Sequence, residues 1–190
     1  FSWDDIYKEL DGLEGGGLNI AYEAIDRHAK TSLREKVALY WEGKDGNSEQ
    51  YTFRDLYILT NRFANVLQSL GIKKGDRVFT YMDRTPEIFI AILGTLKAGA
   101  VVGPLFSAFG PDAVKDRLQD SGARILITTP GLVATVHEIA GELPALEKII
   151  IVNRRKTPYE LNENEVSYER IMGSASEEFE IVKTEKEDKA

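Results

Sequence analysis

The sequence predicts an α/β fold in which a doubly wound, mostly parallel sheet carries helices on both faces. Between residues 77 and 172, short strand patterns and helix patterns alternate four times, which is the order that parallel βαβ units require. The run from residue 85 to residue 109 is the most informative, because it holds a helix start, a helix stop and a buried strand in succession. A helix that leads directly into a buried strand is half of a βαβ unit.

Residues 1–35 are expected to form a leader that packs on the main body. The glycines at 15–17 indicate a flexible joint, since no strand precedes them and no lysine follows them, as a phosphate-binding loop would require. Asn19 is a good helix cap, and apolar residues at helical spacing continue to about residue 29. The segments 37–41 and 49–52 flank a turn-forming stretch and predict a β-hairpin.

A long helix is predicted from Thr52 to Leu70. Thr52 and Asp55 form a capping-box pattern, an apolar stripe follows at helical spacing, and Gly71 ends the helix. A turn then leads into a strand at residues 77–81.

The helix at residues 86–98 has both ends marked by its own residues. Thr85 suits the N-cap and Pro86 suits the first helical position. Lys97 and Gly99 mark the C-terminal end. Almost no polar face lies between these ends, so we expect neighbouring elements to cover this helix on most sides.

The rest of the chain repeats the pattern and then changes in composition. After a strand at 100–104, the sequence predicts helices at 111–121, 132–139 and 168–172, and strands at 124–128 and 148–152. Apolar density falls from residue 154 onward, and residues 177–190 contain six acidic residues and three lysines, so we expect an exposed linker or an edge strand there. The chain therefore divides into a leader at 1–35, an α/β core at 36–153 and a polar segment at 154–190.

Composition narrows the functional classes. A net charge of −7 and a pI near 5.0 argue against nonspecific nucleic-acid binding, which depends on cationic contacts with phosphates. The absence of cysteine excludes disulfides, thiolate metal sites and a cysteine nucleophile, and it suits a reducing cytoplasm. No apolar run of about eighteen residues is free of charge, so the sequence predicts neither a membrane-spanning helix nor a membrane partner.

The two histidines do not predict a metal site. His28 and His137 lie far apart in the sequence and lack the spacing of metal ligands. His28 lies on the apolar face of its predicted helix and is expected to pack or to form a hydrogen bond, whereas His137 is expected on a helix surface. Nor does any Ser/His/Asp set or carboxylate pair indicate a catalytic centre.

Four motifs together resemble one enzyme family. They are residues 19–28, NIAYEAIDRH; residues 75–78, GDRV; the stretch 85–109; and residues 113–118, AVKDRL. In this order and spacing, from about residue 18 to about residue 129, the chain resembles the N-terminal part of an AMP-forming acyl-CoA synthetase of the adenylate-forming ligase superfamily, most of all the acetyl-CoA synthetases. The resemblance implies that these residues form the N-terminal portion of the large domain of such a ligase.

This resemblance implies an enzyme that activates a carboxylate with ATP and Mg and transfers it to CoA, with acetate or a similar acid as substrate. The family's Gly/Ser/Thr-rich phosphate loop ending in Pro-Lys-Gly does not occur in these 190 residues, nor do its later hinge and its C-terminal catalytic lysine segment. We therefore expect no catalytic residue and no metal ligand here, no tightly bound cofactor, and the remainder of the polypeptide as a partner. A non-catalytic α/β binding or assembly module is the alternative.

One loop is a candidate for contact with CoA. Phe106, Ser107, Ala108 and Phe109 follow a predicted central strand, where open α/β sheets tend to bind ligands. In acetyl-CoA synthetases the matching loop lies beside the tunnel for the pantetheine arm of CoA, so the resemblance implies that these residues form part of its wall. The family often has glycine where this chain has Ser107 and Ala108, and added side chains would narrow the tunnel. The alternative is an ordinary strand-to-helix turn with both phenylalanines in the core.

Arginines could hold the phosphates of CoA, since a guanidinium group suits phosphate geometry. The candidates are Arg77, Arg84, Arg117 and Arg124. Related enzymes carry arginine a little after the strand matching residues 124–128, but this chain has no basic residue at 131–136, which argues against a phosphate clamp there. Arg117 is expected to form a surface ion pair on its own helix.

Overall fold

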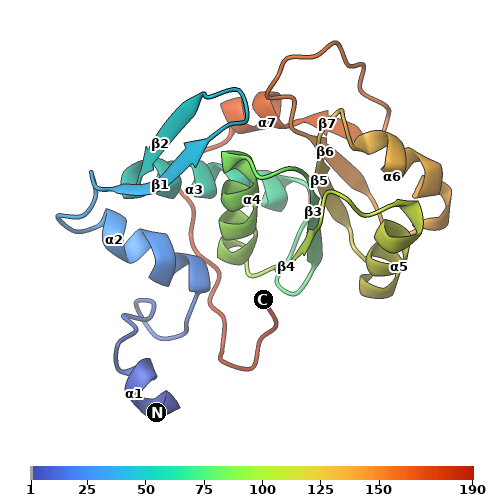
Figure 1. Cartoon of the computed structure of the whole chain (residues 1–190). Coiled ribbons are helices and arrows are strands. Elements are labelled where there is room, and N and C mark those ends of the chain that lie inside the picture. The colour runs from blue at the N-terminus through green and yellow to red at the C-terminus, as the bar shows by residue number, and fades with distance from the viewer. Residues whose placement is uncertain (1) are drawn as a thin grey trace.

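The computed structural model describes residues 2–190 and has the predicted doubly wound α/β fold (Figure 1). Five parallel strands form one sheet in the order β4-β3-β5-β6-β7. They are β3 at Arg77–Tyr81, β4 at Val101–Leu105, β5 at Ile125–Thr128, β6 at Lys148–Ile151 and β7 at Glu165–Ser167. The chain leaves β3 for β4 on one side and returns to β5 on the other, so the strand order reverses around β3.

Helices cover both faces of the sheet (Figure 1). On one face lie α3 at Phe53–Ser69, α4 at Pro86–Lys97 and α7 at Tyr168–Ser174; on the other lie α5 at Pro111–Ser121 and α6 at Val133–Ile139, which η2 at Ala140–Glu142 extends. The connection after β3 therefore runs to one face, and the connections after β4 and β5 run to the other. Ligand sites of open α/β sheets form at such a change of side.

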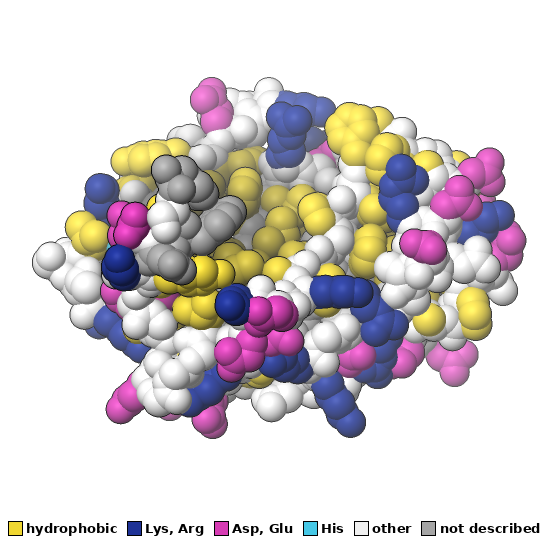
Figure 2. Space-filling model, turned by 90° about the horizontal axis from the view of Figure 1, so that it is seen from below, with side chains coloured by type: hydrophobic (Ala, Val, Ile, Leu, Met, Phe, Trp, Pro, Cys, Tyr) yellow, Lys and Arg dark blue, Asp and Glu magenta, His cyan; other side chains and the backbone are white. Residues whose placement is uncertain are grey.

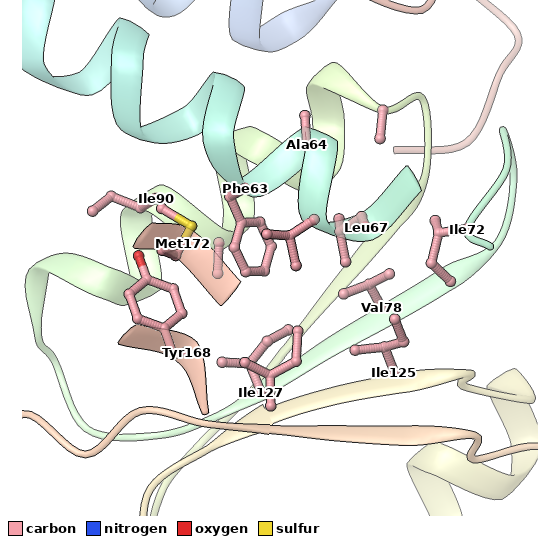
Figure 3. Packing of buried hydrophobic residues seen from close by; sticks show 14 of the residues in the cluster. Phe63, Ala64, Leu67, Ile72, Val78, Ile90, Ile125, Ile127, Tyr168 and Met172 are labelled. Atoms are coloured by element: carbon pink, nitrogen blue, oxygen red, sulfur yellow. The ribbon is translucent and has the colours of Figure 1, made fainter. Parts of the chain in front are cut away.

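The strands divide their side chains between two apolar cores because successive residues of a strand point to opposite faces. Ile125 and Ile127 of β5 belong to the core under α3 and α4, whereas Leu126 between them belongs to the core under α5 and α6. Figure 3 shows the first core, in which Phe63 points from α3 into the core and the Tyr168 ring of α7 lies beside it, 6.1 Å away. Burial on both faces explains why these strands are apolar without alternation.

The ends of α3 and α4 follow from local sequence, with one difference. Thr52 and Asp55 form the expected capping box at the start of α3. Thr85 occupies the N-cap of α4, but its side chain makes no capping hydrogen bond and its hydroxyl is buried without a partner, so the expected cap is wrong in this detail. Gly99 follows the end of α4 with a φ of 68°, which favours glycine.

Other elements cover α4 on most sides, as expected, and only Phe89 among its twelve residues is exposed. Lys97 contributes to this in an unexpected way. Its ammonium group is completely buried and lies 2.8 Å from a carboxylate oxygen of Asp26, with Asn61 Oδ1 at 2.6 Å. Sequence analysis treated Lys97 only as a helix-end signal. Burial lowers the pKa of Lys97 and raises the pKa of Asp26, while the attraction between the two groups opposes both shifts.

The leader contains short helical segments. A short α1 at Trp3–Tyr7 leads to the turn containing the 15–17 glycines, and the helical segment after it consists of a π-helical turn, η1 at Tyr22–Asp26, and α2 at Arg27–Ala29. Asn19 Oδ1 accepts hydrogen bonds from the backbone N–H groups of Ala21 and Tyr22, so it caps this segment as predicted. Asn19 Nδ2 also donates to the carbonyls of Leu96 and Val182, which ties both ends of the chain to α4.

The predicted hairpin is present as β1 at Val37–Glu42 and β2 at Ser48–Thr52, an antiparallel pair separate from the main sheet. Strand β7 is an element that sequence analysis missed, because it has only three residues and includes a glutamate. β7 and α7 both lie beyond residue 153, and the division of the chain at that point stays a prediction. No helix among residues 2–190 has the length and apolar character needed to cross a bilayer.

Candidate functional site

A cleft of about 1160 Å³ lies at the carboxyl ends of the parallel strands. Loops that follow β3, β4, β5 and β6 all contribute to it, and the β1–β2 hairpin forms the facing wall. The lining residues that the following paragraphs use are Trp41, Arg84, Phe106, Ser107, Arg154 and Arg155. This is the position at which open α/β sheets bind ligands, so the cleft is the candidate functional site.

A second cavity lies elsewhere and is smaller, about 150 Å³. Leu18 and Ile20 of the leader, the residues before β4 and the last residues of the chain line it, so it is at the amino ends of the strands. Figure 2 views the molecule from below and shows apolar side chains gathered in a hollow of this lower face. The strand-end loops do not reach it, so it is a weaker candidate than the cleft.

The structure brings two of the four predicted CoA-contact residues to the cleft. Phe106 and Ser107 line it, and the Phe106 ring is 60% exposed. Ala108 is exposed in the turn but does not line the cleft. Phe109 packs against the core under α5 and α6, with its carbonyl accepting a 2.6 Å hydrogen bond from the Tyr81 hydroxyl. Contact of any of the four with CoA stays a prediction.

Of the four candidate arginines, only Arg84 lines the cleft. Arg77 donates to the carbonyls of Ser121 and Gly122 at the end of α5. Arg124 pairs with Asp76 and Glu147 at the amino ends of the strands. Arg117 lies over the Phe109 ring at 4.4 Å, so the expected surface ion pair is replaced by a cation–π contact.

Arg154 is a residue of the cleft that sequence analysis missed. It follows β6 and joins three elements, since its guanidinium group pairs with Glu49 of β2, lies 2.7 Å from Glu87 of α4 and lies 4.4 Å from the Trp41 ring of β1. Its position two residues after a buried strand was the one available signal. The contacts fix the hairpin wall against the strand ends.

The same wall is further fixed by Trp41 and Tyr51. Trp41 Nε1 donates a 2.9 Å hydrogen bond to the carbonyl of Arg84, in the loop after β3. The Tyr51 hydroxyl bonds to Glu49, and burial together with this neighbouring carboxylate raises the pKa of Tyr51 to about 12. Tyr51 is therefore a neutral hydrogen-bond donor at physiological pH.

The two histidines serve different structural roles. His28 packs against the Phe53 ring at 4.9 Å, in line with the sequence. His137 is not a simple surface residue, because its Nε2 lies 2.6 Å from the buried carboxylate of Glu165 in β7. Burial would raise the pKa of Glu165, but hydrogen bonds from the Asn162 backbone, His137 and Tyr159 outweigh it and keep that pKa below its usual value. Sequence gave no sign of this pairing across 28 residues.

Known proteins match this chain over most of its length. The sequence model of a family described as AMP-binding enzyme matches residues 25–190. The chain belongs to this family. The resemblance found in the four motifs is thereby confirmed.

Two curated relatives show the range of this similarity. The acetyl-coenzyme A synthetase of Bacillus subtilis (strain 168) is 40% identical over 190 residues, which is 99% of this chain and 32% of that protein. The 3-hydroxypropionyl-coenzyme A synthetase of Sulfurisphaera tokodaii is 35% identical over 183 residues, covering 87% of this chain and 28% of that protein. The chain thus spans about a third of the length of these relatives.

A solved structure supports the fold over the whole chain. The acyl-CoA synthetase of Brucella canis matches with a TM-score of 0.87 and 29% sequence identity, covering 99% of this chain and 33% of that one. The predicted fold class, a portion of an adenylate-forming ligase with a parallel sheet, is therefore confirmed.

Proposed function

We propose that the whole protein is an AMP-forming acyl-CoA synthetase that acts on acetate or a similarly small acid. The observation that carries this proposal is a ligand-sized cleft at the carboxyl ends of the sheet, in a chain 40% identical to an acetyl-coenzyme A synthetase. The similarity to a 3-hydroxypropionyl-coenzyme A synthetase keeps the choice of acid a matter for experiment. The cysteine-free sequence suits a cytoplasmic enzyme.

In this reaction ATP and the carboxylate give an acyl adenylate and pyrophosphate, and the CoA thiol then displaces AMP to form the thioester. Such chemistry requires cations and hydrogen-bond donors to neutralise phosphate charge during transfer. The side chains that the structure describes include no group of three or more His, Asp or Glu able to hold a metal ion, and the sequence has no phosphate-binding loop. We therefore place Mg-ATP binding in the remainder of the polypeptide.

The role of this chain would be to supply one wall of the CoA passage. Phe106 and Ser107 line the cleft and would contact a flexible, partly apolar ligand such as the pantetheine arm. Ala108 and Phe109 would support that loop from behind, with Phe109 anchored in the core. The cleft has both apolar rings and cationic side chains, which fits a ligand that is apolar along one part and anionic at the other.

The whole protein tests the proposed reaction directly. We expect AMP and acyl-CoA to form in equal amounts from ATP, Mg and CoA with acetate, propionate or 3-hydroxypropionate, and the relative rates will identify the acid. Absence of acid-dependent AMP formation with all three would contradict the proposal.

The 190-residue chain alone is expected to be inactive, because the phosphate-handling residues lie outside it. The measurement is acetate-dependent release of pyrophosphate by the purified chain, with the whole protein as positive control. Turnover by the chain alone would show that the assignment of Mg-ATP to the remainder is wrong. Calorimetry with CoA and with ATP distinguishes the proposed role from the alternative of a non-catalytic module. Binding of CoA without binding of ATP supports a wall of the CoA passage, and binding of neither leaves only a scaffold.

A further inference from the structure

We propose that Arg84 is an anion-binding residue of the cleft and that it holds a phosphate group of the bound ligand. The choice of CoA as that ligand rests on the proposed function, whereas the assignment of Arg84 rests on the geometry of this chain. Three arginines line the cleft, namely Arg84, Arg154 and Arg155. What separates them is the carboxylates that each already contacts.

Arg154 is not available to a ligand. Its guanidinium group pairs with Glu49 and Glu87, and one face of the group lies over the Trp41 ring. An incoming phosphate would have to displace two carboxylates and a cation–π contact. Arg155 has a looser partner, since its guanidinium lies 3.9 Å from Asp45 and both side chains are largely exposed. Its charge is therefore partly offset, although weakly.

Arg84 differs from both neighbours. Among the side chains that the structure describes, no carboxylate oxygen lies within 4.0 Å of its guanidinium nitrogens, and its own side chain is exposed at the cleft. Its backbone is nevertheless held in place, because Trp41 Nε1 donates to the Arg84 carbonyl at 2.9 Å. The loop is also anchored on both sides by the buried residues Met82 and Pro86. An ordered backbone that presents an unpaired guanidinium loses less conformational entropy when it binds an anion.

The ligand class follows from the chemistry of the rim. A guanidinium group can donate two parallel hydrogen bonds to a phosphate, and the exposed Phe106 ring on the same cleft offers an apolar surface. Four acidic residues line the cleft as well, beside four cationic ones: Glu42, Asp45, Glu49 and Asp83, with Lys44, Arg84, Arg154 and Arg155. The cleft as a whole is thus not strongly cationic, and a phosphate would be held by a directed contact with Arg84 rather than by net charge.

The test is calorimetric titration of the 190-residue chain with inorganic pyrophosphate and, separately, with CoA. Arg84→Met should weaken pyrophosphate binding about tenfold, the effect expected for one lost charge-assisted contact. The pyrophosphate affinity of Arg84→Lys should fall between those of the wild type and Arg84→Met, because lysine keeps the charge but not the planar guanidinium group. Arg170→Met is the matched control, since Arg170 is an exposed arginine on α7 that does not line the cleft. Binding to the wild type should also weaken as salt increases.

The outcomes separate the two levels of the proposal. Equal pyrophosphate affinity of wild type and Arg84→Met, or no pyrophosphate binding by the wild type, overturns the role of Arg84. Arg84-dependent binding of pyrophosphate without binding of CoA supports the anion site and contradicts CoA as its ligand. The thermal unfolding midpoint should not change in Arg84→Met, because the backbone carbonyl that accepts from Trp41 remains.

Discussion

At the scale of single residues, the cost of buried charge is concentrated in Lys97 and Asp26. Both side chains are almost fully removed from water, and Asn61 supplies a further oxygen to the ammonium group at 2.6 Å. Desolvation of two ions consumes most of the energy that their attraction provides, so such a pair adds little net stability. It does make each partner indispensable to the other, and it links the leader to α4.

Lys97→Met should therefore destabilise the chain strongly, by about 3–5 kcal/mol, because it leaves the Asp26 carboxylate buried without a cation. The measurement is the free energy of unfolding from urea denaturation. The double variant Lys97→Met, Asp26→Leu should recover most of the loss, since no unpaired charge remains. A loss below about 1 kcal/mol in the single variant would contradict this account of the pair.

At the scale of elements, the β1–β2 hairpin is the part that most depends on a few contacts. A two-stranded hairpin is marginally stable by itself in water. Here Leu39 and Tyr51 pack against the core under α3, and Arg154 reaches Glu49 and Trp41 from the loop after β6. The position of this wall of the cleft therefore depends in part on a residue far away in the sequence, at a separation of 105 from Glu49.

Arg154→Met should loosen the hairpin while the main sheet stays folded. We expect the fluorescence of Trp41 to shift to longer wavelength as water reaches the ring, and backbone amides of β1 and β2 to exchange faster, corresponding to about 1–2 kcal/mol of local stability. Arg155→Met is the control, because Arg155 has only the 3.9 Å contact with Asp45. Equal protection of the hairpin in both variants would refute the role of Arg154.

At the scale of the whole molecule, the two ends of the chain are tied to the end of α4. Asn19 Nδ2 donates to Leu96 and Val182, the Val182 N–H donates to the Lys97 carbonyl, and Leu18 forms a β-bridge with Thr184. A single buried amide thus serves as a cap for the leader helix and as a link between segments that are 163 residues apart. Opening of one end is expected to open the other.

Asn19→Ala tests this coupling. The substitution removes a helix cap and two long-range hydrogen bonds to backbone carbonyls, so we expect a loss of about 1–3 kcal/mol in stability. Hydrogen exchange should accelerate together in residues 20–24 and in residues 182–184. Faster exchange in the leader alone would show that the two ends are independent.

Local sequence was sufficient for most elements. Apart from α1 and the short η2, the helices and the first six strands were predicted within a few residues, because capping residues, prolines, glycines and apolar periodicity act within one or two turns of chain. The four-motif resemblance also placed the chain in its family, and strand-end position brought Phe106 and Ser107 to the cleft. Strand β7 escaped detection because its neighbours in the sheet, rather than its own residues, make it a strand.

The sequence by itself determined the layered α/β order and the family, since both depend on patterns that are read along the chain. Only the tertiary structure decided which charged residues are paired: Lys97 with Asp26 across 71 residues, His137 with Glu165, and Arg154 with Glu49. Such pairs have no local signature, because a charge is stabilised by whatever the fold brings within a few ångströms. The same physical reason leaves Arg84 as the arginine of the cleft without a carboxylate partner among the residues that the structure describes.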